Sequence, residues 1–220
     1  KAYAENYRDA FTRNSAELPD GENLSILDPA PRLFLDSELG LLTAASRASD
    51  CILAESIALH TFDIVERTEA LGGYDPVGEL DLFRMEYWEL EQAKLKKQGA
   101  PLVFAGEIAL VTGSASGIGC ACVEAFRSRG AAVVGLDLKS SESAADYLPL
   151  NVDITDSPLV EQAIAQTVDN FGGLDMLILN AGVFPLTKLL AEMDDETWRK
   201  TLSLNLDANQ SLLRLAYPLL

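Results

Sequence analysis

The 220-residue chain carries 34 acidic and 17 basic side chains, for a formal net charge of −17. This excess of negative charge argues against binding to nucleic acid, whose phosphates need lysine and arginine, and more weakly against binding to an anionic membrane. The single histidine excludes a multi-histidine metal site, and no apolar run approaches the roughly 20 residues that span a bilayer. With three cysteines that we expect to be reduced, the composition indicates a cytoplasmic protein that binds no metal.

The first hundred residues predict helices and one hairpin. Apolar spacing favours helices over residues 1–13, 49–71 and 79–97. Between the first two helices, the prolines, glycine and polar residues of 14–31 predict a loop. Two short apolar runs within 32–43 flank a turn that ends in a glycine, which predicts a β-hairpin.

Beyond Pro101 the pattern changes to alternating strands and helices. This alternation requires right-handed crossovers and predicts a doubly wound parallel sheet of the Rossmann type, with strand order 3-2-1-4. Ligands then bind at the carboxyl ends of strands 1 and 4, where the winding reverses. We predict strands at 108–112, 131–137, 147–152 and 174–179, and helices at 117–129, 157–171 and 196–215.

A glycine-rich turn joins the first of these strands to its helix. Gly113 permits the sharp turn, Gly117 lets the backbone approach a pyrophosphate, and Gly119 lets the helix pack closely on the sheet. Backbone N–H groups and the positive end of the helix dipole converge there on a site for a phosphate. Taken by itself, the turn is equally compatible with a tight connection that binds nothing.

Two carboxylates follow later strands of the predicted sheet. Asp137 ends the second strand, where it can accept both ribose hydroxyl groups of NAD and repel the 2′-phosphate of NADP. Lys139 lies two residues on and could soften that preference. Asp153 ends the third strand and could bind the adenine amino group. The alternative for each is an acid on the surface at a strand end.

Amide side chains mark the fourth strand and the helix that follows it. Asn180 can brace neighbouring strands, and Gly182 lets the backbone come close to a cofactor. Asn205 lies in a leucine-rich helix, where we expect it to be buried, to need hydrogen-bond partners, and either to bend the helix or to hold a water molecule.

Together these residues resemble the short-chain dehydrogenase/reductase family over residues 104–220. The resemblance implies a Rossmann-type fold and hydride transfer between NAD(P) and an alcohol or carbonyl substrate. It also implies that Asn205 belongs to an Asn-Ser-Tyr-Lys catalytic tetrad and holds a water in the proton relay. The cofactor-binding residues that it implies are Gly113, Ser116, Gly117, Ile118, Gly119, Asp137, Asp153, Asn180 and Gly182.

The chain departs from the family pattern at the catalytic motif Tyr-x-x-x-Lys. None of its six tyrosines is followed by lysine four residues later. We therefore expect a fragment, with an incomplete sheet of four strands, that does not turn over by itself although the full-length protein does. The alternative is a module that binds NAD without catalysis.

Residues 86–95 and 104–113 resemble the domain junction of bifunctional rhamnulose-phosphate aldolase/short-chain alcohol dehydrogenases. This resemblance implies that 1–73 are the end of a class II aldolase-like domain, 74–103 a helical linker and 104–220 the start of the dehydrogenase domain. It also implies rhamnose metabolism and a lactaldehyde-type substrate. We expect the full-length protein to be a homo-oligomer, because leucines of the last helix would be exposed or seek partners: Leu202, Leu204, Leu206, Leu212, Leu213 and Leu215.

Overall fold

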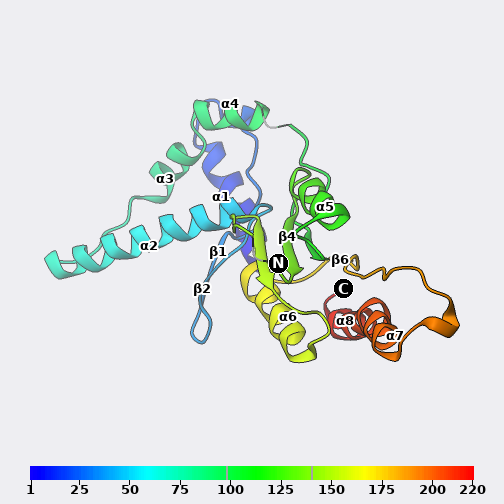
Figure 1. Ribbon diagram of the computed structural model, residues 1–220. Helices are drawn as coiled ribbons and strands as arrows, with labels where there is room; N and C mark the ends of the chain where they lie inside the picture. The colour runs from blue at the N-terminus through cyan, green and yellow to red at the C-terminus, as the bar shows by residue number, and fades with distance from the viewer. Residues whose placement is uncertain (98, 140) are drawn as a thin grey trace. The chain divides into compact units, whose positions relative to one another are not determined.

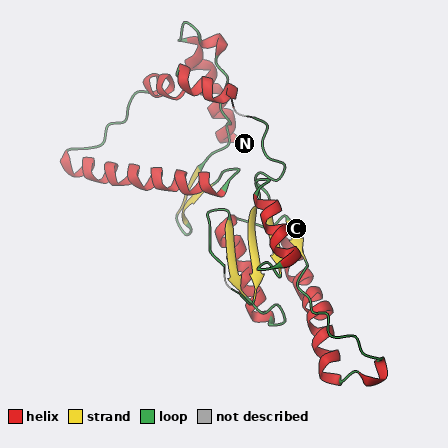
Figure 2. Cartoon of the chain, turned by 45° about the horizontal axis from the view of Figure 1, so that its top comes forward, coloured by secondary structure: helices red, strands yellow, loops and turns green. Residues whose placement is uncertain are grey.

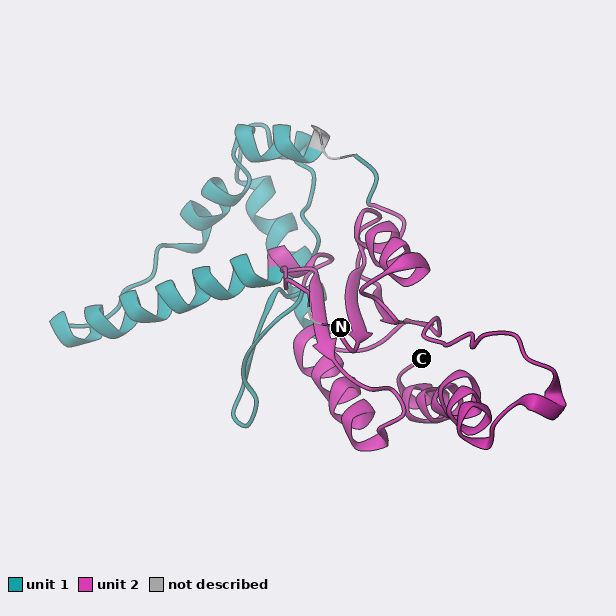
Figure 3. Ribbon diagram, in the orientation of Figure 1, with its two compact units in different colours: residues 1–44, 51–101 teal, residues 45–50, 102–220 magenta. Residues whose placement is uncertain are grey.

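The computed structural model describes residues 1–97, 99–139 and 141–220, whose helices and strands are labelled in Figure 1. The chain divides into two compact units (Figure 3). Unit 1 comprises Lys1–Ala44 and Cys51–Pro101, and unit 2 comprises Ala45–Asp50 and Leu102–Leu220. Each unit is described by itself below.

Unit 1 consists of helices and the predicted hairpin. Strands β1 (Leu33–Asp36) and β2 (Gly40–Thr43) are antiparallel, and both N–H groups of the turn residues Glu38 and Leu39 donate to the Asp36 carboxylate. The remaining elements are α1 (Ala2–Ala16), the short 3-10 helix η1 (Gly21–Asn23), most of α2 (Ala48–Leu71), α3 (Glu79–Glu86) and α4 (Glu89–Lys97).

The predicted boundaries in unit 1 were wrong at two places. Helix α1 continues into the predicted loop as far as Ala16, because the Asn14 amide donates to the carbonyl of Ala10 and to Glu79 Oε1, each at 2.9 Å. The predicted helix 79–97 is two helices. Its interruption falls at Tyr87, whose buried ring stacks on Phe83 at 4.5 Å between centroids. Tertiary packing has overridden local helix propensity at both places.

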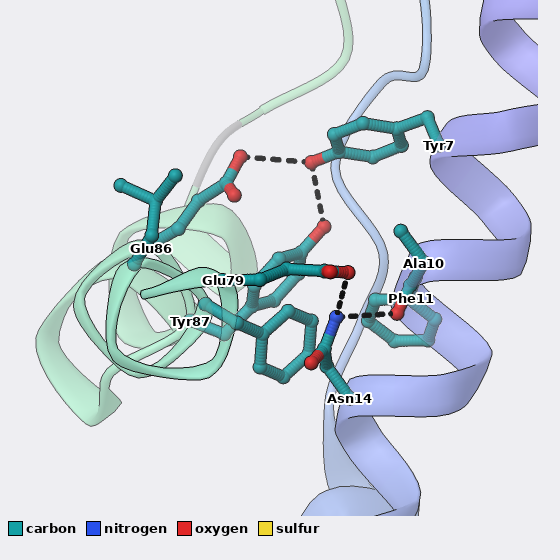
Figure 4. A pocket seen from close by; sticks show the side chains of 9 residues that line it. Tyr7, Ala10, Phe11, Asn14, Glu79, Glu86 and Tyr87 are labelled. Atoms are coloured by element: carbon teal, nitrogen blue, oxygen red, sulfur yellow. Dashed lines mark hydrogen bonds between the residues drawn. The ribbon is translucent and has the colours of Figure 1, made fainter. Parts of the chain in front are cut away.

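The aromatic core of unit 1 encloses a small pocket between α1 and α3 (Figure 4). Tyr7 donates its hydroxyl hydrogen to Glu86 Oε1 at 2.8 Å and lies 2.7 Å from the Tyr87 hydroxyl. Burial, followed by the hydrogen bonds with Tyr87 and Glu86, raises the pKa of Tyr7 well above its usual value. The polar groups at this end of the pocket are therefore bonded to one another.

Unit 2 contains a four-stranded parallel sheet of order β5-β4-β3-β6 (Figure 2). This order confirms the predicted 3-2-1-4 arrangement and the doubly wound fold. The strands are β3 (Ile108–Thr112), β4 (Ala132–Asp137), β5 (Tyr147–Asn151) and β6 (Met176–Ile178). The helices are α5 (Gly117–Arg127), α6 (Ser157–Phe171), α7 (Asp195–Leu202) and α8 (Ala208–Ala216).

Helices cover both faces of this sheet, because alternate strand residues point to opposite sides. On one face, Val111 and Val133 pack with Val123 of α5. On the other face, Leu110 and Val134 form a cluster to which α6 and α8 contribute. This second cluster includes Leu212, which is fully buried, so the expectation that the leucines of the last helix would be exposed or seek partners was wrong for this residue. Leu202, Leu206 and Leu213 are exposed.

The predicted helix 196–215 has a π-helical turn at its centre. Helix α7 continues through the π-turn Ser203–Asp207 into α8, and Asn205 is the middle residue of that turn. An extra residue in one helical turn bends the helix and is common at functional sites. No helix in the described part of the chain combines the length and apolar character needed to cross a membrane.

Candidate cofactor site at the carboxyl edge of the sheet

The glycine-rich turn leaves β3 and enters α5 without room for side chains at two positions. Gly113 has φ +67°, a left-handed conformation that favours glycine, and its N–H donates to the Leu136 carbonyl at 2.8 Å. At Gly119, a Cβ atom would overlap the carbonyl oxygen of Gly113. Gly117 is open, with nothing within 4 Å of the position that its Cβ would take. The turn therefore packs closely on its own helix and leaves free space at Gly117.

The first turn of α5 has the features of an anion site. Ser116 precedes the helix in an extended conformation, and its side chain does not cap the helix. No acidic residue occupies the first turn, and the Ile118 side chain is exposed. Helix N–H groups without a capping side chain, together with the positive end of the helix dipole, favour a phosphate at this place.

Thr112, to which the sequence assigned no separate role, ties this turn to the end of β6. Its buried hydroxyl oxygen accepts the N–H groups of Asn180 and Ala181, both at 2.9 Å. In return, the Asn180 amide donates to the Thr112 carbonyl at 2.9 Å. Asn180 thus braces the neighbouring strands β3 and β6, as its position in the sequence indicates. A polar side chain as the last residue of an otherwise apolar strand was the signal for Thr112.

Asp137 lies directly beside the glycine-rich turn. One carboxylate oxygen accepts the N–H of Ala115 in the turn at 3.0 Å, and the other accepts the N–H of Lys139 at 3.0 Å. Each carboxylate oxygen keeps a further lone pair that can accept a hydroxyl hydrogen. The same negative charge would repel a phosphate group placed against it.

Asp153 lies in the loop after β5, and its neighbours hold it in place. Its Oδ1 accepts the Thr155 hydroxyl at 2.7 Å and the Thr155 N–H at 2.9 Å. These two bonds lower the pKa of Asp153, so the exposed side chain is ionised at neutral pH. Asp153 lies close to Asp137, because the N–H of the preceding residue, Val152, donates to the Asp137 carbonyl at 2.9 Å.

Asn205 joins the π-turn to the segment after β6. Its side-chain oxygen accepts the Val183 N–H at 2.9 Å, and its amide donates to the Val183 carbonyl at 2.8 Å. A Cβ atom at Gly182 would lie 3.1 Å from the Asn205 oxygen, so the two segments are in close contact. The prediction that Asn205 is buried was wrong, because the residue is exposed; its need for hydrogen-bond partners was confirmed.

Hydrogen bonds thus bring most of the predicted site residues to one edge of the sheet. Gly113, Asp137 and Asn180 lie at the carboxyl ends of β3, β4 and β6, and the Val183 contacts add Asn205. Among the residues that the structure describes, no group of three or more His, Cys, Asp or Glu side chains could hold a metal ion. This edge combines a helix start without a capping side chain, the Asp137 carboxylate beside it and the amide hydrogen bonds of Asn180 and Asn205.

Comparison with protein families gives two matches along the chain. Residues 107–220 match the family model described as short chain dehydrogenase, and residues 1–95 match the one described as aldolase class II, second domain.

Curated relatives match one or both parts. "Uncharacterized oxidoreductase YuxG" of Bacillus subtilis is 28% identical over 94% of this chain and 30% of its own length. "3beta-hydroxysteroid dehydrogenase 2" of Eggerthella lenta is 34% identical over 48% of this chain and 45% of its own length. "3-oxoacyl-[acyl-carrier-protein] reductase FabG" of Escherichia coli is 36% identical over 48% and 46%. The chain therefore spans less than half of each of these relatives.

Solved structures with the same fold include two from Brucella melitensis. A short-chain dehydrogenase/reductase described as glucose/ribitol dehydrogenase is 31% identical, with a TM-score of 0.51 over 54% of each chain. A 3-ketoacyl-(acyl-carrier-protein) reductase complexed with NADH is 26% identical, with a TM-score of 0.50 over 52% of this chain and 50% of the other. The dehydrogenase model matches just over half of the residues of this chain, and the aldolase model matches the residues before them. The chain therefore belongs to the short-chain dehydrogenase family and carries an aldolase class II domain at its N-terminal end.

Proposed function

We propose that the full-length protein is an NAD-dependent short-chain alcohol or aldehyde dehydrogenase fused to a sugar-phosphate aldolase. The observation that carries the choice of NAD is the Asp137 carboxylate, which accepts the Ala115 N–H of the glycine-rich turn at 3.0 Å. A carboxylate held there can accept the ribose hydroxyl groups of NAD and repels the 2′-phosphate of NADP. The solved relative that is complexed with NADH supports the same choice.

The residues at the sheet edge fit a dinucleotide. We assign the pyrophosphate to the turn and first helical residues Gly113, Ser116, Gly117, Ile118 and Gly119, because the helix start is uncapped and Gly117 is open. Asp137 would hold the ribose and Asp153 the adenine, while Asn180 and Gly182 would border the nicotinamide end. Bound NAD would supply the hydride acceptor. Asn205 is the catalytic residue of this chain, within a tetrad whose serine, tyrosine and lysine lie elsewhere in the full-length protein.

The substrate assignment rests on the aldolase part. Residues 1–95 match an aldolase class II domain, and residues 86–113 resemble the junction of rhamnulose-phosphate aldolase/dehydrogenases. An aldolase that releases lactaldehyde would supply the dehydrogenase with its small-molecule aldehyde substrate, in rhamnose metabolism. We propose that the aldolase-like domain ends at residue 73, that residues 74–103 are a helical linker and that the dehydrogenase domain begins at residue 104.

We also propose that the full-length protein is a homo-oligomer and that it is located in the cytoplasm. Leu206 and Leu213 are 60% and 50% exposed on the last helix. Exposed apolar side chains that share one helix favour a subunit contact.

Cofactor affinity tests the central claim. Calorimetry on the full-length protein should give at least about tenfold tighter binding of NAD than of NADP, since a charged hydrogen-bond partner contributes about 1.5–3 kcal/mol. Asp137→Asn should weaken NAD and narrow that ratio. Asp169→Asn, which removes the same charge from the exposed C-terminal end of α6, should change neither affinity. Equal affinity of the unmodified protein for NAD and NADP would contradict the proposal.

The second candidate function is an NAD-binding module without catalysis, which the absence of Tyr-x-x-x-Lys from these 220 residues favours. The isolated chain should show no turnover with lactaldehyde, because it contains no such general acid and lysine. The full-length protein separates the candidates. NADH production or consumption with a small alcohol or aldehyde supports the dehydrogenase, whereas NAD binding without turnover supports the module.

A further inference from the structure

Both polar atoms of the Asn205 side chain are engaged by one neighbouring residue. Its oxygen and its nitrogen are each bonded to the backbone of Val183, at 2.9 and 2.8 Å. Asn205 also carries a backbone carbonyl, which is held by a different residue. This carbonyl lies within the π-turn Ser203–Asp207, where regular helical pairing is interrupted.

Asn209, one turn further along, holds that carbonyl. Its Nδ2 donates to the Asn205 carbonyl oxygen at 2.8 Å. A carbonyl oxygen can accept two hydrogen bonds, and the amide of Asn209 takes one of these positions. Asn205 is thus held at two points, its side chain by the backbone of Val183 and its backbone carbonyl by the side chain of Asn209.

The other polar atom of the Asn209 side chain is buried and lacks a donor. Among the residues that the structure describes, Asn209 Oδ1 is the buried side-chain polar atom without a hydrogen-bond partner. Buried polar atoms in proteins are paired, by ordered water where no protein group reaches them. An acceptor next to the bonded Asn205 carbonyl is therefore suited to a water molecule that donates a hydrogen bond.

Asn170 provides an internal comparison. Its Nδ2 donates to the Gln166 carbonyl, four residues earlier in α6, also at 2.8 Å. Asn170 is exposed and lies in a regular helix. The bond alone is hence an ordinary helix feature, and what distinguishes Asn209 is the π-turn that it holds and the buried oxygen that it leaves free.

We propose that Asn209 is a positioning residue of the dehydrogenase site, which fixes the Asn205 carbonyl and binds one water molecule through its Oδ1. This role rests on the proposed function, because it requires that Asn205 takes part in the reaction. Asn209 acts through Asn205 and the water, and it does not itself touch the cofactor or the substrate.

Steady-state kinetics of the full-length protein test this role. Asn209→Ala should lower kcat by about 10- to 100-fold, the cost of a displaced catalytic group, and leave the Kd for NAD within about twofold. Asn209→Gln, which keeps both polar atoms, should recover part of kcat. Asn209→Asp, which has nearly the same shape but no N–H donor at neutral pH, should not. Asn170→Ala is the matched control and should keep kcat.

A purely structural role would lower the melting temperature without this split between kcat and NAD affinity. Equal kcat for Asn209→Ala, Asn170→Ala and the unmodified protein would overturn the role of Asn209 alone. A full-length protein that binds NAD but turns over no alcohol or aldehyde would overturn the proposed dehydrogenase and this role with it. The NAD affinity of each variant checks that it has folded. If the alanine variant does not fold, the kcat of Asn209→Asp is compared with that of the unmodified protein instead.

Discussion

Asn205 and Val183 form a two-way hydrogen-bonded pair, in which the side-chain amide of one satisfies both backbone polar groups of the other. The pair connects the π-turn to the residue directly after Gly182, 22 positions away in the sequence. The backbone N–H and carbonyl of Val183 are bonded to the same side chain, so the segment after β6 has an anchor on the helix in addition to the bonds of Asn180 and Ala181 to Thr112. The position of Val183 then depends on one residue of the helix.

Replacing Asn205 by alanine should release the backbone of Val183. The loss of two hydrogen bonds should cost about 1–2 kcal/mol of stability at this point. Hydrogen–deuterium exchange at the Val183 amide should accelerate, while exchange in β3 stays unchanged. Alanine at Gln210, an exposed neighbour on α8, is the control. Unchanged protection of the Val183 amide in Asn205→Ala would show that the pair does not anchor the segment.

Alanine at Gly119 should damage the glycine-rich turn. The added Cβ would overlap the Gly113 carbonyl and lie 2.6 Å from Asn180 Nδ2, so α5 must move away from the sheet. Overpacking of this kind costs about 1–3 kcal/mol, and NAD affinity of the full-length protein should fall with it. Gly173→Ala is the control, because its Cβ would meet nothing within 4 Å. Equal melting temperatures and NAD affinities for the two variants would show that the glycine-rich turn does not require glycine at position 119.

The ion pair of Arg127 with Asp146 should make stability depend on pH. Two hydrogen bonds from the guanidinium, at 2.8 and 3.1 Å, hold the pKa of Asp146 below its usual range. A lowered carboxyl pKa stabilises the fold above the unfolded-state value of about 3.9, and the effect is lost as the pH falls through the folded-state pKa. The side chains are 33% and 40% exposed, so screening by solvent limits the gain to about 1 kcal/mol or less.

Thermal denaturation of Asp146→Asn across the pH range measures this effect. The variant should be less stable than the unmodified protein at pH 7, and the difference should shrink as the pH falls below the unfolded-state value. Asp81→Asn breaks the more exposed pair with Arg84, whose side chains are 54% and 64% exposed, and should have the smaller effect at pH 7. A difference for Asp146→Asn that stays constant into strong acid would exclude the ion pair as its cause.

The hydrogen bonds that join Tyr7, Glu86 and Tyr87 in unit 1 should depend on the hydroxyl group of Tyr7. The Leu27 N–H donates to the Tyr87 hydroxyl oxygen at 3.3 Å, and Tyr7 donates to Glu86. The Tyr87 hydrogen is therefore free to point to Tyr7. Tyr7→Phe leaves both Tyr87 and Glu86 without this partner and should destabilise the protein by about 1–2 kcal/mol. Tyr3→Phe, at an exposed ring stacked on Tyr7, is the control; equal denaturation midpoints for the two variants would contradict the network.

Local sequence patterns predicted the structure correctly where a residue type restricts the backbone conformation. The glycines at 113 and 119 predicted the turn because no other residue fits there. The apolar runs predicted the order of the four parallel strands, since right-handed crossovers leave few alternatives. The same patterns failed at Tyr87, where helix propensity continues but an inward-facing ring ends α3. The cofactor contacts of Asp137, Asp153 and Asn180 stay predictions.

The amino-acid sequence by itself determined the doubly wound sheet, the family and the position of the glycine-rich turn, because periodicity and backbone restrictions act over a few neighbouring residues. Only the tertiary structure decided how distant polar groups are paired: Thr112 with Asn180, Asp137 with Ala115, and Asn205 with Val183. Each of these bonds joins residues at least 22 positions apart, and its 3 Å geometry exists only once the strands and helices are packed. A pattern along the chain shows which groups are available, and packing selects the partner of each.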